Sequence, residues 1–477
     1  MSNHALRTLL QSVDWSAEMA SDVDISPAPD PILPTPLRIG QSSAAAHAAV
    51  GLAVARVWQL RTGRLQQVAV DTRRATASLR STRYLRLNGK PIPTDRNALM
   101  GFYPARDGRW SYLHCNFPHH LSAALSVIGV AAGDHEAVRQ AVARWDALDL
   151  EEAIIAAGGA GGMVRSKQEW TEHPQALAVA SLPVLQILKI GDSPRERLPE
   201  SERPLSGIRA LDLTRVLAGP SCGRTLAEHG ADVLRITAAH LPSIDYQEYD
   251  TGHGKLSAQL DLRQAGDLET LRALIRESDV FSQGYRPGTL ARRGLSLQSL
   301  TDLRPGIIVV SLSAFGHIGP WASRRGFDTV VQAVSGIADR QGNLFGGAGP
   351  QFYPVSAIDY LTGSLLAFGA IVALVLRAQQ GGSWLVRTSL AQVGRWLVGQ
   401  GEVAESGLRD VPLEFSPQEL DQWSIVTNTP IGRLQHLAPV LQLSETPTRW
   451  ARPVVPAGYH EPIWPPRAGV LTGSADN

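Results

Sequence analysis

The chain has 477 residues, of which 44% are hydrophobic and 19% are charged, so its size predicts two or three domains with ample buried cores. Its 45 Lys and Arg nearly balance its 44 Asp and Glu, and a net charge of +1 gives no electrostatic reason to expect nucleic acid or an anionic membrane as partner. Only Cys115 and Cys222 occur, which excludes a disulfide framework and favours a reducing, cytoplasmic location.

The first 200 residues divide into three expected segments. Residues 1–36 lack the basic and apolar regions of a signal peptide and become rich in Pro and Asp, so we expect an extension or linker. Residues 37–75 predict a helix of small residues, a Gly turn and a strand that pack on the large domain. Residues 76–200 mix strand and helix patterns, and we expect a smaller α+β domain there.

Residues 201–400 read most clearly, because strand and helix patterns alternate. Strands are predicted at 208–214, 231–237, 257–262, 280–285, 306–315 and 384–390, with helices at 222–229, 327–338 and 359–377 among them. This alternation predicts an α/β fold with a doubly wound, Rossmann-like parallel sheet. Ligands of such sheets bind beyond the carboxyl ends of the strands. Residues 401–477 are rich in Pro and Trp, and we expect them to wrap over the rest of the chain.

The stretch 360–376 is apolar enough to resemble a membrane span but is short for one. Thr362, Gly363 and Ser364 dilute it, so we interpret it as the central helix of a large core and expect no membrane. An ungapped alignment sets it beside 38–75 and pairs Gln41 with Asp359. The two segments are either a true repeat or unrelated helices of similar composition.

Three motifs suggest chemistry that their surroundings do not support. GHGKLS at 252–257 lacks the Ser or Thr and the upstream Gly of a phosphate-binding loop. GPSCG at 219–223 lies too far from the preceding strand for a nucleophile elbow, so Ser221 is expected to cap a helix. The three histidines of HCNFPHH at 114–120 lack a fourth ligand at regular spacing, and we predict no metal site.

Two carboxylates begin predicted helices. Asp359 opens the apolar helix and Asp328 opens the preceding one, where an ordinary capping role is the alternative for both. A partly desolvated carboxylate is a strong nucleophile if it stays ionised, which a helix N-terminus favours. Arg286 and Arg292 flank a Pro-Gly turn after a strand, a place suited to an anionic ligand.

Several stretches in this region together resemble the family III CoA-transferases, a family that includes carnitine CoA-transferases, formyl-CoA transferases and α-methylacyl-CoA racemases. The matching stretches are RPLSGIRALDLTRVLAGPSCGRTLAEHGADVLRI, GYRPGTLARRGL, IIVVSLSAFGHIGPWASRRGFDTVVQAVSG and VSAIDYLTGSLLAFGAIVALVLRAQQGG, between residues 203 and 393. Residues 37–200 resemble the part that follows this helix in the family, so the chain looks circularly permuted. In this interpretation Gln41 is an inactive copy of the nucleophile.

The resemblance implies a function and a set of site residues. Asp359 would be the nucleophile that carries CoA as an aspartyl thioester, with Asp328 beside the substrate. The positions that match family contacts to CoA are Val216, Tyr285, Arg286, Arg292 and Arg325. The resemblance implies an acyl-CoA and a small carboxylic acid as substrates, no permanently bound cofactor and a homodimer.

Two alternatives stay open. An acyl-CoA racemase or lyase could use the same scaffold, although Phe327 stands where racemases carry a His and cannot accept a proton. A CoA-binding protein without turnover is also compatible, because the family's Gly-rich flap is absent from PIPTDRNALM at 91–100. The missing flap and Gly284, in place of the family's Asn, also argue against oxalate or formate as the substrate.

Overall fold

The computed structural model describes residues 3–467 except 95, 132–133, 200 and 348. Its largest sheet has seven strands in the order β11-β10-β9-β12-β13-β14-β8. In that order they span Lys255–Gln259, Asp232–Thr237, Arg209–Asp212, Val280–Gln283, Ile308–Ser313, Ser383–Ser389 and Gln186–Gly191. The first six strands run parallel and β8 joins the edge antiparallel to β14. The predicted doubly wound α/β fold is therefore confirmed.

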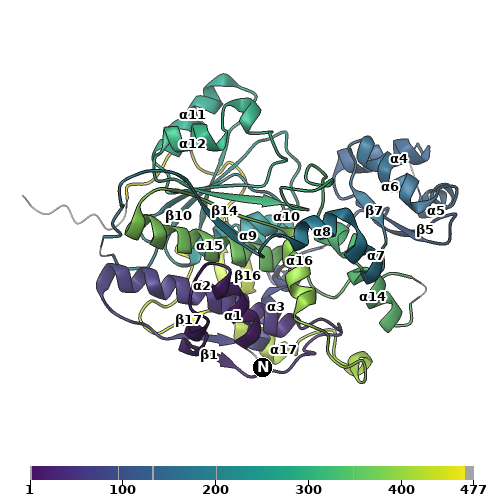
Figure 1. Ribbon diagram of the computed structural model, residues 1–477, viewed down its shortest axis with the longest axis horizontal. Coiled ribbons are helices and arrows are strands. Elements are labelled where there is room, and N and C mark those ends of the chain that lie inside the picture. Colours follow the sequence, from purple (N-terminus) through teal and green to yellow (C-terminus); the bar gives the residue numbers. More distant parts are fainter. Residues whose placement is uncertain (1–2, 95, 132–133, 200, 348, 468–477) are drawn as a thin grey trace, which may run out of the picture.

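Both faces of this sheet are buried, which explains why its strands are almost continuously apolar. Successive residues of one strand enter two different cores, as Ala210 and Leu211 of β9 show. In Figure 1, helices α11 (Ala265–Arg276) and α12 (Leu297–Leu303) cover one face, while α9 (Ala218–Glu228) and α15 (Ala357–Gln380) cover the other. The chain order reverses between β9 and β12, so a ligand crevice is expected at their carboxyl ends.

Helix α15 is the central helix of the larger core. It is long and apolar enough to cross a membrane, but 89% of its most apolar window is buried inside the protein. It packs between α9 and α2 (Ile39–Thr62). A helix that is apolar on every side suits this position, which agrees with the interpretation of 360–376 as a core helix.

Helix boundaries differ from the prediction at two places. Helix α9 begins at Ala218, since Pro220 is tolerated in a first turn, so Ser221 lies inside the helix and the prediction that it caps the helix is wrong. The predicted helix 327–338 is two helices, α13 (Asp328–Val334) and α14 (Ile337–Leu344). Gly336 separates them with a φ of 85°, and a Cβ there would collide with the backbone of Lys167.

The two similar segments form the same structure. Helices α2 and α15 each have 24 residues, and each leads through a glycine at positive φ into a parallel strand. A Cβ on Gly51 of α2 would collide with Val68, just as one on Gly369 of α15 would collide with Val386. The equal spacing of these contacts supports a true repeat over two unrelated apolar helices.

Residues 3–36 are part of the fold and not a linker. Helix α1 (Asn3–Gln11) buries Leu6, Leu9 and Leu10 completely. Strand β1 (Val23–Ser26) pairs in parallel with β2 (Val68–Asp71), and β17 (Gln442–Leu443) completes a three-stranded sheet. The short apolar spacing of α1 was too weak a signal beside the Pro-rich stretch that follows it.

The segment 76–200 is divided among three sheets. Only its middle forms the smaller α+β unit at the right of Figure 1, and β8 belongs to the large sheet. The unit contains β5 (Gly101–Pro104), β6 (Trp110–Leu113), β7 (Gly161–Met163), α4 (Pro118–Ile128), α5 (His135–Val142) and α6 (Ala147–Ala156). Helices α7 (Lys167–Glu172) and α8 (Pro174–Ala180) lead back to the large sheet. Single-chain patterns do not reveal these pairings, because they join segments far apart in the sequence.

The C-terminal segment contains a hairpin that its Pro and Trp content concealed. Strands β15 (Ser424–Thr429) and β16 (Gly432–Leu437) pair with β3 (Arg86–Leu87) and β4 (Lys90–Pro91). The remaining elements are α3 (Thr72–Ser78), α10 (Asp245–Thr251), α16 (Leu390–Gly399), α17 (Pro417–Trp423) and four 3₁₀ turns at Ala17–Asp22, Ser81–Tyr84, Ala291–Arg293 and Leu408–Asp410. After the hairpin, Trp450 donates a hydrogen bond to Arg224 of α9 and Trp464 donates one to Leu274 of α11.

Candidate active site

Asp359 lies in the first turn of α15, where two cavities meet. The first cavity has a volume of about 330 Å³ and lies at the carboxyl ends of β9, β12 and β13. The second has a volume of about 440 Å³ and extends toward residues 80–100. The residues common to both linings are Phe117, Val216, Leu217, Phe327 and Asp359. Asp359 is the one carboxylate among the described residues of this shared wall, so a molecule in either cavity can reach it.

The backbone around Asp359 is held by Asp328 at the start of α13. Asp328 Oδ2 accepts a hydrogen bond from the Asp359 backbone N–H at 3.0 Å. Its other oxygen accepts one from Gln332, and the Tyr353 hydroxyl in turn accepts one from the Ile358 N–H at 3.2 Å. These contacts satisfy backbone donors that the first turn of a helix leaves unpaired. Asp328 thus positions the loop and helix that carry the nucleophile candidate.

Burial raises the pKa of both carboxylates. Burial raises the pKa of Asp359 well above its usual 3.8, and the charge of Asp328 raises it further. Burial also raises the pKa of Asp328 to about 6, although its hydrogen bonds from Gln332 and Asp359 oppose the shift. Two nearby carboxylates do not ionise independently. An ionised Asp359 in this setting is poorly solvated and correspondingly nucleophilic.

The first cavity carries the basic groups expected of an anion site. Arg286 and Arg325 both line it with Tyr285, and no described carboxylate forms an ion pair with either arginine. Burial and the nearby charge of Arg286 lower the pKa of Arg325, so a bound anion would relieve their mutual repulsion. Predicted contacts Val216, Tyr285, Arg286 and Arg325 are thereby brought together.

Arg292 does not join them. It lies in an exposed turn, where its guanidinium is close to Gly288, and it lines neither of the two cavities. Its contact with CoA therefore stays a prediction.

Val216 occupies the wall between the cavities in an unusual conformation. Its φ is 73°, a left-handed value that costs a β-branched residue roughly 1–3 kcal/mol. The residue connects β9 to α9, and Leu217 directly follows it. Strain of this kind persists where surrounding structure enforces it, which here orients the wall beside Asp359.

The histidine-rich motif contributes more to the site than the sequence indicated. Phe117, His119 and His120 line the first cavity, and the His114 ring stacks on Phe327 with centroids 3.9 Å apart. Burial lowers the pKa of both His114 and His120 to about 3, so both rings are neutral near pH 7. The only sequence signal was the unusual density of aromatic rings after a predicted strand.

Comparisons with known proteins agree with this geometry. Residues 205–414 match the profile of CoA-transferase family III. The "Acetyl-coenzyme A transferase nodX" of Hypoxylon pulicicidum is 31% identical over 326 residues, which cover 64% of this chain and 55% of that protein. The "Succinate--glutarate CoA-transferase" of Agrobacterium fabrum is 34% identical over 203 residues, which cover 39% of this chain and 50% of that protein.

The chain spans about half the length of these curated relatives. Among solved structures, a CAIB/BAIF family protein from Brucella suis aligns at 28% identity and a TM-score of 0.37, covering 42% of this chain and 56% of its own. Strands β9, β12 and β13, whose carboxyl ends border the first cavity, lie inside the matched region together with Asp328 and Asp359. Residues 205–414 are therefore similar in sequence to CoA-transferase family III.

Proposed function

We propose that this protein transfers CoA from an acyl-CoA to a small carboxylic acid through a covalent intermediate on Asp359. The observation that carries the proposal is the position of Asp359 at the junction of two cavities. One cavity offers arginines to the phosphates of CoA, and the other is open to an acyl group or an acid. The name of one similar protein, "Succinate--glutarate CoA-transferase", supports small acids as substrates.

The first half of the reaction moves CoA onto the protein. The Asp359 carboxylate attacks the thioester carbonyl of the acyl-CoA, and the C–S bond breaks to give a mixed anhydride and CoA thiolate. The thiolate then attacks the aspartyl carbonyl of the anhydride, which releases the donor as a carboxylate and leaves an aspartyl-CoA thioester. Each step replaces one activated acyl bond with another, so the energy of the thioester is retained as long as water does not attack the intermediates.

The second half repeats these steps in reverse. The acceptor carboxylate attacks the aspartyl-CoA carbonyl and displaces the thiolate, and the thiolate takes the acyl group from the new anhydride. Asp359 is restored as a carboxylate. The C–S bond broken in the donor is replaced by a C–S bond to the acceptor. Asp328 serves this cycle by holding the Asp359 backbone.

The racemase alternative fits the site less well. It needs proton acceptors on both faces of the substrate α-carbon, and Phe327 presents an apolar ring at the shared wall. His120 lies beside that ring, but with its pKa lowered to about 3 it is a weak base at neutral pH. These features favour acyl transfer over proton abstraction.

The test is CoA exchange measured over a panel of acyl-CoAs and organic acids. We expect wild-type protein to form new acyl-CoAs, and Asp359→Asn to reduce the rate about 1000-fold or more while still binding CoA. Exchange of the substrate α-proton with solvent without acyl transfer would support racemisation. CoA binding without either reaction would support the inactive alternative and contradict the proposal.

A further inference from the structure

The second cavity has a chemical character of its own. Apart from the five shared wall residues, none of the described residues that line it also lines the first cavity. It is lined by three arginines, Arg80, Arg83 and Arg96, which all precede the region that matches family III. Among the described residues of its lining, the acidic ones are Asp328 and Asp359, the two residues of the proposed reacting centre. The lining of the second cavity thus has acidic side chains at the proposed reacting centre and basic side chains from residues 80–96.

The three arginines differ in how far their charge is already compensated. Arg80 and Arg83 both donate to Glu414 Oε1, at 3.1 and 2.8 Å, so they share one carboxylate. Arg96 is exposed, and its guanidinium carbon lies 5.7 Å from the centre of the Phe352 ring. No carboxylate among the described residues forms an ion pair with it. Arg96 is therefore the group in this cavity most able to bind a further anion.

The charge of Arg96 reaches the cavity interior. It lowers the pKa of Asp328 against the dominant effect of burial, and it acts in the same direction on Tyr246, another lining residue. A small acid whose reacting carboxyl group meets Asp359 would direct its other end into this cavity. An apolar end would desolvate cationic groups without replacing their hydrogen bonds, whereas a second carboxylate would pair with them.

We propose that the second cavity selects acyl groups and acids that carry a second carboxylate, and that Arg96 binds this distal carboxylate. The inference rests on the proposed transfer at Asp359, because that reaction fixes which end of the acid faces the nucleophile. The substrate class is then a short dicarboxylic acid and its CoA monothioester.

The test compares two thioesters that differ only at the far end of the acyl chain, succinyl-CoA and butyryl-CoA. We expect the wild type to favour succinyl-CoA in kcat/KM, and Arg96→Gln to reduce kcat/KM for succinyl-CoA about 10- to 100-fold, as expected for a lost charge-assisted hydrogen bond. The value for butyryl-CoA should stay within about threefold. Arg106→Gln, which removes an exposed arginine paired with Asp146 in the smaller unit, is the matched control and should leave both values unchanged.

Equal use of the two thioesters by the wild type, or an equal loss for both in Arg96→Gln, would overturn the proposal. A binding measurement separates this failure from failure of the transfer reaction itself. Succinate and butyrate are titrated calorimetrically into Asp359→Asn protein with and without Arg96→Gln. Succinate should bind more tightly only when Arg96 is present, whether or not the wild type transfers CoA, and butyrate binding as tightly as succinate would contradict the inference.

Discussion

Two opposing effects act on the Asp359 side chain and would set its proposed reactivity. Burial and the neighbouring Asp328 both favour the protonated form, while the N-terminus of α15 favours the ionised form. A carboxylate that ionises in such surroundings keeps little of the hydration that would blunt its attack on a thioester. The two roles are divided, since Asp328 holds the backbone and Asp359 faces the cavities.

Replacing Asp328 with Asn should move the pH dependence of transfer. Asn keeps an oxygen that can accept the Asp359 N–H but removes the negative charge that raises the pKa of Asp359. Because the nucleophile must be ionised, the acidic limb of the pH–rate profile should shift to lower pH, with a severalfold gain in relative rate below about pH 6. An unchanged limb, or one displaced to higher pH, would show that Asp328 does not act on Asp359 electrostatically.

Sequence patterns predicted the residues of the first cavity better than those of the second. Asp328, Asp359 and the arginines of the first cavity follow strands or begin helices within one stretch of α/β structure, where topology alone brings them together. Arg80, Arg96 and His120 come from earlier segments whose position depends on how the smaller unit packs. No local spacing reveals that packing, so these residues could not be assigned from the sequence.

At the scale of elements, the beginning of helix α15, which carries Asp359, lies unusually close to the beginning of α9. A Cβ on Gly363, one turn after Asp359, would lie 2.5 Å from Ser221 Cβ and 2.6 Å from the Ala218 carbonyl oxygen. The start of α9 at Ala218 follows directly on the strained wall residue Val216. The glycine therefore sets the distance between the nucleophile and the wall beside it.

Gly363→Ala should separate these helix starts. We expect a loss of about 1–3 kcal/mol in the free energy of unfolding and a reduced transfer rate, because Asp359 and Val216 both move. Gly266→Ala in α11 is the matched control, since a Cβ there meets nothing within 4 Å and alanine favours helix by about 0.5–1 kcal/mol. Denaturant unfolding and transfer rates measure both effects. A variant as active and stable as the wild type would mean that the contact is not needed.

Helix α2 repeats the structure of α15 but has no carboxylate at the position of Asp359. Asp30 Oδ2 accepts the Gln41 N–H at 3.0 Å, the same arrangement as Asp328 with Asp359. Gln41 nevertheless has an amide in place of the nucleophile and lines neither of the two cavities. The ungapped alignment predicted that Gln41 and Asp359 occupy equivalent positions. It did not predict that Asp30 takes the role of Asp328, because Asp30 lies in a loop and Asp328 begins helix α13.

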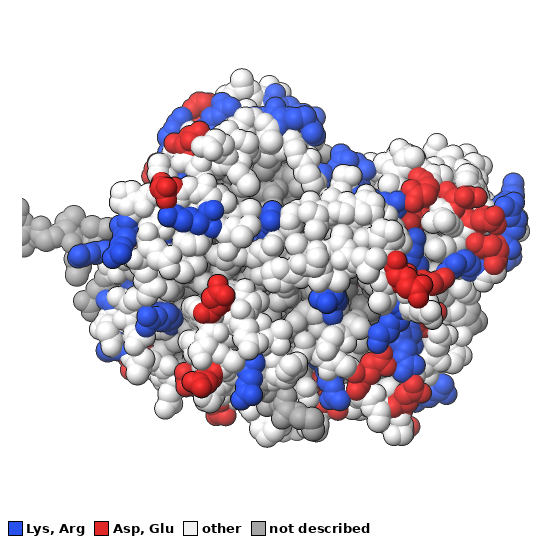
Figure 2. Space-filling model, in the orientation of Figure 1, with Lys and Arg blue, Asp and Glu red and all other residues white. Residues whose placement is uncertain are grey.

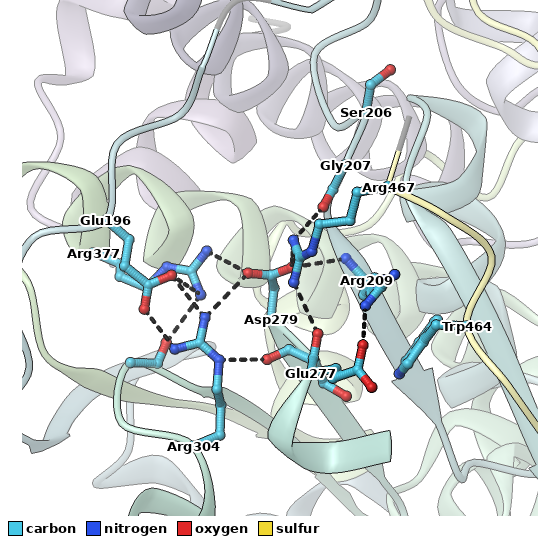
Figure 3. Close-up of polar contacts among 12 residues, drawn as sticks. Glu196, Ser206, Gly207, Arg209, Glu277, Asp279, Arg304, Arg377, Trp464 and Arg467 are labelled. Atoms are coloured by element: carbon cyan, nitrogen blue, oxygen red, sulfur yellow. Dashed lines mark hydrogen bonds and ion pairs between the residues drawn. The ribbon is translucent and has the colours of Figure 1, made fainter. Parts of the chain in front are cut away.

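At the scale of the molecule, a buried charge network fixes the end of the sheet remote from Asp359 (Figure 3). Asp279, just before β12, contacts Arg377 of α15 at 2.9 Å and Arg467 of the tail at 3.1 Å, and it accepts the backbone N–H of Arg209 at 2.9 Å. Arg304 adds a contact to Asp279 at 3.5 Å and pairs with Glu196. One carboxylate thus joins the sheet, the central helix and the C-terminal segment.

Asp279→Asn should destabilise the whole fold. Burial alone would raise the pKa of Asp279, but Arg377 and Arg467 outweigh it and lower the pKa, so the ionised form stabilises the protein and this contribution is lost as pH falls below about 4. Removing the charge leaves Arg377 buried without its main partner, a loss of about 3–5 kcal/mol. Glu269→Gln, which breaks exposed ion pairs, should cost less than about 1 kcal/mol in the same urea unfolding experiment. Equal effects would contradict a structural role for the network.

Acidic and basic side chains are interspersed over the face shown in Figure 2, in keeping with the net charge of +1. The doubly wound sheet was predictable from alternating strand and helix patterns, whereas the interleaving of residues 1–91 and 424–467 with it required long-range pairing. The homodimer and the circular permutation stay predictions, and light scattering tests the first.

The most direct test asks whether Asp359 becomes covalently attached to CoA. Protein incubated with acyl-CoA is treated with hydroxylamine or with borohydride, then digested and mapped by mass spectrometry, with Asp359→Asn as the control. We predict an aspartyl hydroxamate, or the alcohol from reduction, at residue 359 of the wild type alone. Acyl transfer with no modification there, or with the modification on another residue, would contradict an aspartyl-CoA intermediate at Asp359.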